Sequence, residues 1–131
     1  MGRAVAKLGL VPDTIVASPA ARARQTAEVA ARAMGFVDDI RFEGELYDAF
    51  GEAWLQALRA LPAAAESVLV VAHSPGIAEA AALLSGAPAR AIDVPTAGLI
   101  AFVQDLSRWK ELDEGEASLR WFLRPKLVEK L

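Results

Sequence analysis

The sequence contains no cysteine and only one histidine, His73. Without cysteine the chain can form no disulfide, no thiolate nucleophile and no thiolate metal site, and a single histidine argues against structural zinc. Long apolar runs are also lacking: no stretch of 18 or more apolar residues occurs, and the N-terminus lacks the apolar core of a signal peptide. We therefore expect a soluble, cytoplasmic protein.

Positive charge is neither abundant nor concentrated. The formal net charge is −3, the isoelectric point is about 5.2, and the basic residues are scattered without a run of five or more. A general nucleic-acid binder or a membrane-surface binder needs a positive patch, so neither partner is expected. The length of 131 residues fits about one domain. The oligomeric state is left open.

What the chain does have is apolar residues, 54% of the total and largely alanine. Alanine-rich helices can lie close to a sheet, which suits a compact α/β domain. After a helix tail, short apolar runs alternate with helical patterns and two strands follow, which predicts a mostly parallel sheet with helices on both faces, a three-layer α/β/α fold. Strands are expected at 14–17, 40–46 (weakly, followed by a loop), 67–72, 98–105 and 117–123, and helices at 1–10, 18–34, 51–61 and from 74 to about 86. The strands 67–72 and 98–105 are expected to be buried, and the helix 51–61 to bury Trp54, Leu55, Leu58 and Leu61.

Two of the predicted strand-to-helix turns resemble each other. Ser18-Pro19 follows the strand 14–17, and His73-Ser74-Pro75 follows the strand 67–72, the strongest candidate for a buried parallel strand. Ser18 is expected as N-cap, with Pro19 at the first helical position. Ligands of open parallel sheets bind beyond the carboxyl ends of the strands, where helix N-termini favour anions. The sequence therefore predicts an anion site, with phosphate as the favoured ligand.

Arg22 sharpens this prediction because it lies in the first turn of its helix, where a cation opposes the helix dipole. Side chains there lean back over the strand ends, so an anionic ligand would explain the charge. The alternative is a solvated surface arginine, as we expect for Arg24 on the other side of the helix. His73 has a similar alternative, a histidine satisfied within the core.

Ser74 offers a rival chemistry. Ala72-His73-Ser74-Pro75-Gly76 loosely resembles the nucleophile elbow G-x-S-x-G, but that chemistry needs a histidine base later in the chain, and none follows. The P-loop, the dinucleotide glycine fingerprint and the cysteine-based phosphatase loop are also absent. The rival is therefore rejected.

The two turns together resemble a known family. Ser18-Pro-Ala-Ala-Arg22-Ala-Arg-Gln-Thr26-Ala is similar to the S-x-x-x-R-A-x-x-T-A segment of the histidine phosphatase superfamily, and Leu69-Val-Val-Ala-His73-Ser-Pro-Gly76 to its later G-H-N-P-G segment. The small SixA-like phosphohistidine phosphatases match best. They share further segments along essentially the whole chain: Leu10-Val-Pro-Asp13, Pro95-Thr-Ala-Gly98, Trp109 and Phe122-Leu-Arg-Pro-Lys126.

The resemblance implies a phosphoglycerate mutase-like fold and a hydrolase that works through a phosphohistidine intermediate. It implies that Arg22, with Ser18 at the same turn, binds the phosphoryl oxygens, and that His73 stabilises charge on the transferred group. No metal or other cofactor is implied. In the family, an R-H-G segment on the first strand supplies the nucleophilic histidine and a second phosphate-binding arginine.

This chain departs from the family at its start, since it contains no Arg-His-Gly. The resemblance implies a single domain over residues 1–131 that is truncated at its N-terminus and lacks the first strand with its nucleophile. That strand is central in the family's sheet, between the strands matching 67–72 and 98–105. We therefore expect these two strands not to pair, and to have open edges.

Two points remain open from the sequence. A proton donor for the leaving group could be Glu45, with Glu43 and Glu52 as alternatives, although all three could be solvated surface carboxylates. The substrate could be a protein phosphohistidine, favoured because short loops leave little to wrap a metabolite, or a small phosphate ester. A third reading is a non-catalytic phosphate-binding remnant.

Overall fold

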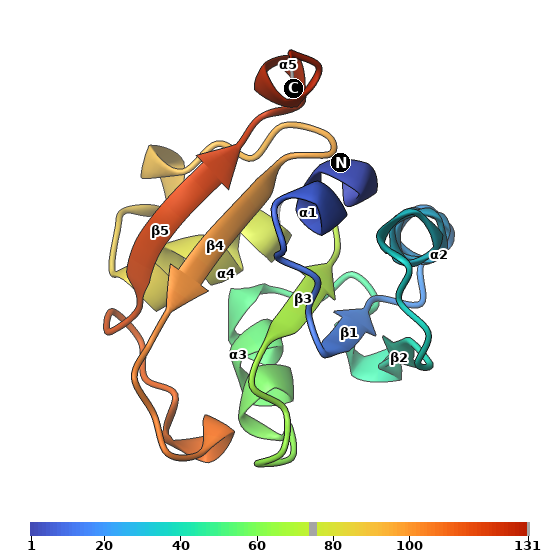
Figure 1. Cartoon of the computed structure of the whole chain (residues 1–131). Coiled ribbons are helices and arrows are strands. Elements are labelled where there is room, and N and C mark those ends of the chain that lie inside the picture. Colours follow the sequence, from blue (N-terminus) through green and yellow to red (C-terminus); the bar gives the residue numbers. More distant parts are fainter. Residues whose placement is uncertain (74–75, 131) are drawn as a thin grey trace.

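The structure, a computed structural model, describes residues 1–73 and 76–130 and has the predicted α/β architecture. Helices lie on both sides of a small parallel sheet, and a separate hairpin packs beside it (Figure 1). The elements in chain order are α1 (Gly2–Lys7), β1 (Thr14–Ala17), α2 (Ala21–Met34), β2 (Arg41–Phe42), η1 (Gly44–Leu46), α3 (Gly51–Arg59), β3 (Val68–Val71), α4 (Gly76–Ser85), η2 (Ala89–Ala91), β4 (Leu99–Val103), η3 (Trp109–Glu111), β5 (Ser118–Leu123) and α5 (Pro125–Val128).

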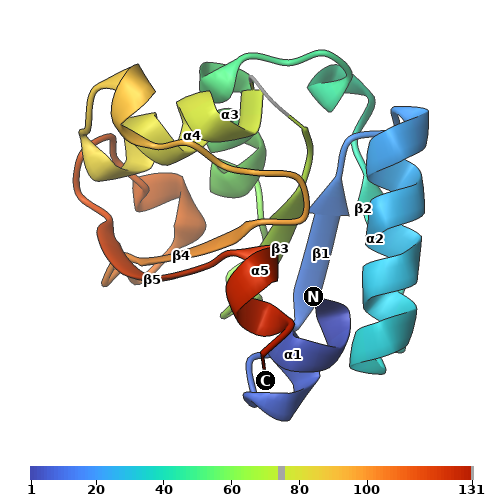
Figure 2. The same ribbon diagram turned by 90° about the horizontal axis from the view of Figure 1, so that it is seen from above.

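The parallel sheet has the strand order β2-β1-β3, so β1 is its central strand. Successive side chains of a strand point to opposite faces, and β1 therefore contributes to two cores. Val16 packs in the cluster formed with α3 and α4, whereas Ile15 and Ala17 pack with α1 and α2 on the other face. Figure 2 shows α2 on one side of β1 and α3 with α4 on the other. The predicted three layers are confirmed.

The second sheet is an antiparallel pair of β4 and β5, interrupted by a register shift between Ala101 and Phe102. Among the described strands, β3 pairs only with β1 and β4 pairs only with β5. The expectation that the strands predicted at 67–72 and 98–105 do not pair is therefore met. Each leaves one edge open toward the gap between the two sheets.

The open edges change the burial of both strands. The sequence predicts that 67–72 and 98–105 are buried, but Val68, Leu69 and Val70 are only half-buried, and β4 is half-buried apart from exposed Val103. By contrast, β1 is buried from Ile15 to Ala17. The prediction was wrong because an apolar run specifies which residues can be buried, and a neighbouring strand is needed to cover them.

The start of α2 also differs from the prediction. The helix begins at Ala21 with Ala20 as N-cap, rather than with Ser18 as N-cap and Pro19 in the first turn. Ser18 instead belongs to the end of β1, because its backbone N–H donates to the Val71 carbonyl (3.1 Å) and continues the β1–β3 ladder by one residue, and two further residues separate it from the helix. The predicted end is confirmed, since Gly35 adopts the left-handed conformation at φ 74°.

The strand expected at 40–46 is confirmed only at Arg41–Phe42, since Gly44–Leu46 forms the 3-10 helix η1, and α5 was not predicted. The helix α3 follows its sequence pattern closely. In α3 and the turn after it, Trp54, Leu55, Leu58 and Leu61 are buried as predicted. The predicted opening of α4 at Ser74-Pro75 lies outside the described residues, and the described part of the helix begins at Gly76. In the part of the chain that the structure covers, no helix is long and apolar enough to cross a membrane.

Candidate anion-binding site

The two predicted turns meet at one cavity. Because β1 and β3 are parallel and in register, with Ala17 beside Val71, both strands end at the same edge of the sheet. A cavity of about 220 Å³ lies at this edge. It is lined by Ser18, Leu46, Asp48, Ala49, Phe50, Trp54, Ala72, His73 and Gly76. The cavity therefore lies where the strand-end rule predicts a ligand site.

Ser18 is the buried polar residue of this cavity, with 2% of its surface exposed. Its backbone N–H is bonded to Val71, and its Oγ accepts a hydrogen bond from the Ala20 N–H (3.2 Å). A hydroxyl can accept and donate at the same time, so the O–H hydrogen of Ser18 can point to a ligand oxygen. The local fold thus fixes the hydroxyl just before the start of α2, and no acceptor for its O–H is found among the described residues.

His73 reaches the same cavity from the end of β3, two residues beyond the last strand residue. It is exposed, so the alternative of a histidine satisfied within the core does not apply. An imidazole beside bound phosphate can donate a hydrogen bond, and in its protonated form it adds a positive charge. The cavity therefore combines a hydroxyl donor and a titratable donor at two different strand ends.

Arg22 lies in the first turn of α2 as predicted, and its side chain is exposed. Among the described residues it forms no ion pair, and it is not in the lining of the cavity. Arg24 is different, since its guanidinium stacks 4.0 Å over the Phe42 ring and lies 3.9 Å from the Glu28 carboxylate. The first turn of α2 holds no acidic residue, so nothing there offsets its positive end. The role of Arg22 stays a prediction.

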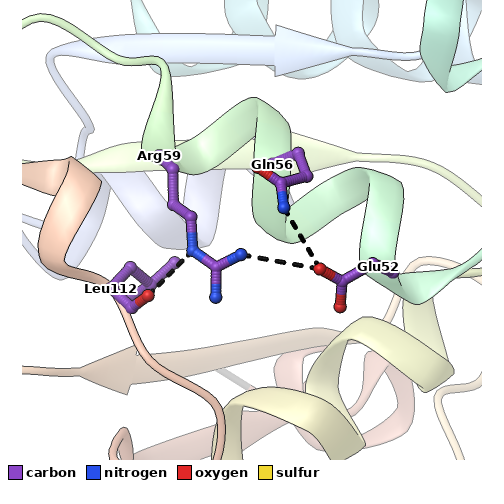
Figure 3. A network of polar contacts seen from close by, with 4 residues as sticks. All are labelled: Glu52, Gln56, Arg59 and Leu112. Atoms are coloured by element: carbon purple, nitrogen blue, oxygen red, sulfur yellow. Dashed lines mark hydrogen bonds and ion pairs between the residues drawn. The ribbon is translucent and has the colours of Figure 1, made fainter.

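The carboxylates considered as proton donors are spread over this end of the molecule. Glu45 is exposed on η1 and is not in the cavity lining, and Glu43 lies 3.7 Å from Arg41. Glu52 is held by Gln56 (3.2 Å) and by Arg59 (3.5 Å), whose Nε also donates to the Leu112 carbonyl (Figure 3). None of the three lines the His73 cavity.

Asp48 is the carboxylate that the cavity lining does contain, and sequence reasoning missed it. Its φ of 50° is unusual for a residue with a side chain, although aspartate tolerates it better than most. The loop that carries Asp48 lies against the start of α4: a Cβ on Gly76 would overlap the Ala49 carbonyl oxygen. No sequence motif marks Asp48 as a site residue, so its place in the same cavity lining as His73 becomes visible only once the loop is folded.

The comparisons with known proteins bear on the fold around this cavity. No protein-family model and no curated protein matches the chain. A solved structure from Agrobacterium tumefaciens, named as a candidate phosphohistidine phosphatase SixA, superposes with a TM-score of 0.76 and 29% identity over 95% of this chain and 75% of that one. A structure of the same designation from Nakamurella multipartitia gives 0.73 and 25%, over 95% and 79%. The chain therefore has the α/β fold of the SixA-like, phosphoglycerate mutase-like structures, as the resemblance in its motifs predicts.

Proposed function

We propose that this chain is the phosphate-binding core of a SixA-like phosphatase that acts on protein phosphohistidine. The observation that carries the proposal is the meeting of Ser18 and His73 at one cavity between two parallel strand ends. The fold around the cavity matches structures named for that activity, which supports the choice of reaction. An alternative within the same chemistry is a small phosphate ester as substrate.

The proposed site acts by electrostatic stabilisation. The Ser18 hydroxyl and the unpaired N–H groups at the start of α2 would bind the phosphoryl oxygens, and Arg22 would turn toward them when phosphate is present. His73 would donate a hydrogen bond to the group in transfer, where negative charge accumulates. Asp48, at the cavity, is a candidate proton donor beside Glu45, because a carboxylic acid within reach of the leaving group can protonate it.

If His73 stabilises the group in transfer, a covalent phosphohistidine intermediate needs another histidine as nucleophile, and His73 is the only histidine in this sequence. We propose that the nucleophile comes from a residue outside these 131 positions, on a strand that fills the gap between β3 and β4. Two observations support this: both strands have open edges, and the match leaves about a quarter of the Agrobacterium chain uncovered. Without such a strand, the chain would bind phosphate and not hydrolyse its esters. A cytoplasmic location stays part of the proposal.

Phosphate binding tests the site directly. Titration of the ¹⁵N-labelled chain with inorganic phosphate should shift the amide signals of Ser18 and His73. Arg22→Gln should weaken binding about tenfold or more, since a charge-assisted hydrogen bond contributes about 1.5–3 kcal/mol. Arg32→Gln, at the far end of the same helix, is the matched control and should leave the affinity unchanged. Equal effects of the two changes would contradict the proposed role of Arg22.

Rapid-quench labelling tests the reaction. The chain should form no acid-labile phosphoenzyme when mixed with a phosphohistidine protein or with an aryl phosphate. Label on His73 would show that this residue is itself the nucleophile and would overturn the proposed division of roles. A polypeptide that adds the missing strand should restore hydrolysis, and its relative rates on the two substrates would decide between protein and small-molecule specificity.

A further inference from the structure

A second concave surface lies beside the anion cavity. It is an open groove of about 580 Å³ between the start of α3, the outer face of α4 and the loop before β5. Its lining consists of Phe50, Gly51, Glu52, Glu79, Ala82, Leu83, Gly86, Ala87, Glu114 and Gly115. Phe50 lines the groove and the anion cavity alike, so it forms the ridge between the two. The proposed catalytic chemistry makes no use of this groove.

The groove has a negative lining built from three different elements. Glu79 of α4 accepts a hydrogen bond from the Gly51 N–H (3.1 Å) at the start of α3, and Glu52 of α3 is held by Gln56 and Arg59. Glu114 faces Glu52 from the loop before β5, and the hydrogen bond and charge of Glu52 raise the pKa of Glu114. Arg59 offsets part of this charge, and among the described residues that line the groove there are three carboxylates and no cation, so the groove keeps a negative excess at neutral pH.

The rest of the groove is apolar and partly aromatic. Ala82, Leu83 and Ala87 form its wall on the α4 side. Phe50 is 71% exposed at its edge, and Tyr47 on the same loop is 61% exposed. An aromatic ring that is exposed to water is energetically unfavourable, and aromatic side chains are enriched at the surfaces where proteins bind one another. An apolar wall with carboxylates at its rim suits a long side chain that carries a positive charge at its end.

We propose that this groove binds a lysine or arginine side chain of the phosphorylated substrate protein. The assignment rests on the proposed function, because the occupant is the protein whose phosphohistidine enters the neighbouring cavity. The aliphatic stem would lie along Leu83, the charged head would meet Glu114 and Glu52, and the Phe50 ring would offer a cation–π contact. A phosphoryl group on one side of Phe50 and a cation on the other would fix the orientation of the substrate.

The groove can be tested by NMR on the ¹⁵N-labelled chain. The probe is the peptide acetyl-Ala-Ala-Arg-Ala-Ala-amide, and its twin carries citrulline, which has the shape of arginine without the charge. The arginine peptide should shift the amide signals of Gly51, Gly86 and Gly115, which line the groove, and the citrulline peptide should not. Equal shifts with both peptides, or no shift at these glycines, would overturn the proposal.

Variants connect the binding to particular side chains. Glu114→Gln should weaken binding of the arginine peptide about two- to fivefold, the range expected for one exposed ion pair. Glu116→Gln is the matched control, because Glu116 is two residues away in the same loop and does not line the groove. Phe50→Ala, at an exposed position, should weaken binding as well. If the Glu114→Gln and Glu116→Gln variants bind the arginine peptide with equal affinity, the assignment of the groove as a cation site is wrong.

The phosphate titration separates this inference from the function on which it rests. Phosphate shifts at Ser18 and His73 without peptide shifts at the groove would reject the groove alone. Peptide shifts without phosphate shifts would reject the phosphatase proposal, and with it the identification of the cation as part of a phosphorylated substrate. Shifts in both places, with phosphate and peptide bound together, are the expected result.

Discussion

Removing the Ser18 hydroxyl should lower the stability of the fold as well as the affinity for phosphate. The Ser18→Ala change removes the acceptor for the Ala20 N–H at a position that is almost fully buried. We expect a loss of about 1 kcal/mol in the free energy of unfolding, the usual effect of deleting such a side-chain acceptor. Urea denaturation measures it. Ser107→Ala, at an exposed position, should change stability by less than about 0.5 kcal/mol.

Removing the charge of Glu114 should stabilise the folded chain at neutral pH, whereas removing the Ser18 hydroxyl should destabilise it. The pKa of Glu114 is raised in the folded chain, first by the hydrogen bond with Glu52, so ionising it is harder when folded than when unfolded. The resulting penalty is present at neutral pH and disappears as the pH falls below the unfolded value of 4.5. Glu114→Gln should therefore raise the Tm at pH 7 and lose this advantage near pH 3.5. A lower Tm at pH 7 would contradict the repulsion between the two carboxyls.

The residues of the site were predictable to different degrees. Ser18 and His73 follow apolar runs, and the rule that parallel strands end at one edge brings them together. Asp48 carries no such signal, because its place depends on a positive φ and on how its loop packs against Gly76. Arg22 was placed on its helix correctly, but the direction of a long exposed side chain depends on its ligand.

At the scale of elements, the start of α4 depends on having no side chain at Gly76. A Cβ there would overlap the Ala49 carbonyl oxygen, so Gly76→Ala must push the loop 47–50 away from the helix. We expect a loss of about 1–3 kcal/mol in unfolding free energy, as in other overpacked sites. Phosphate affinity should fall too, because Ala49 and Gly76 both line the cavity.

Gly44→Ala is the matched control for this element. A Cβ at Gly44 meets nothing within 4 Å, and its backbone does not have a positive φ. It should leave stability within about 0.5 kcal/mol or raise it slightly, because alanine restricts the unfolded chain. If Gly44→Ala and Gly76→Ala lose similar stability, the cause is backbone freedom and not the close contact of α4 with its loop.

The main helices and strands were predictable from the sequence, apart from η1 and α5, and their surroundings were not. The 3.6-residue pattern of α3 and the glycine that ends α2 give the right helices, because both signals are local. The start of α2 was misplaced by two residues, and the bond from the Ser18 N–H to the Val71 carbonyl, 53 positions away, leaves no local signal in the sequence. The burial of β3 and β4 was also misjudged, because the residues that bury a strand come from distant parts of the chain.

The whole molecule consists of two sheets joined by helix packing. β1 is hydrogen-bonded on both sides and buried from Ile15 to Ala17. Among the strands that the structure describes, β4 pairs with β5 alone, and it is half-buried apart from Val103. Both strands of the hairpin contact α4, and Leu99 of β4 also packs against the core cluster that contains Ile15 and Ala17. Apolar burial and backbone pairing are therefore concentrated around β1, and local opening should follow this division.

Hydrogen exchange should make the division visible. We expect the amides of β1 and Ser18 to exchange slowest, and those of β4 and β5 at least about tenfold faster. Ile15→Ala leaves a cavity at a fully buried position (0% exposed) at the centre of β1. It should lower the free energy of unfolding by about 2–5 kcal/mol and reduce the protection of backbone amides throughout the chain. Ile100→Ala, at a half-buried position of β4, should lower protection in the hairpin and leave β1 almost unchanged. Equal loss of protection throughout both variants would mean that the two sheets open as one cooperative unit, and that the open edges of β3 and β4 do not divide the molecule.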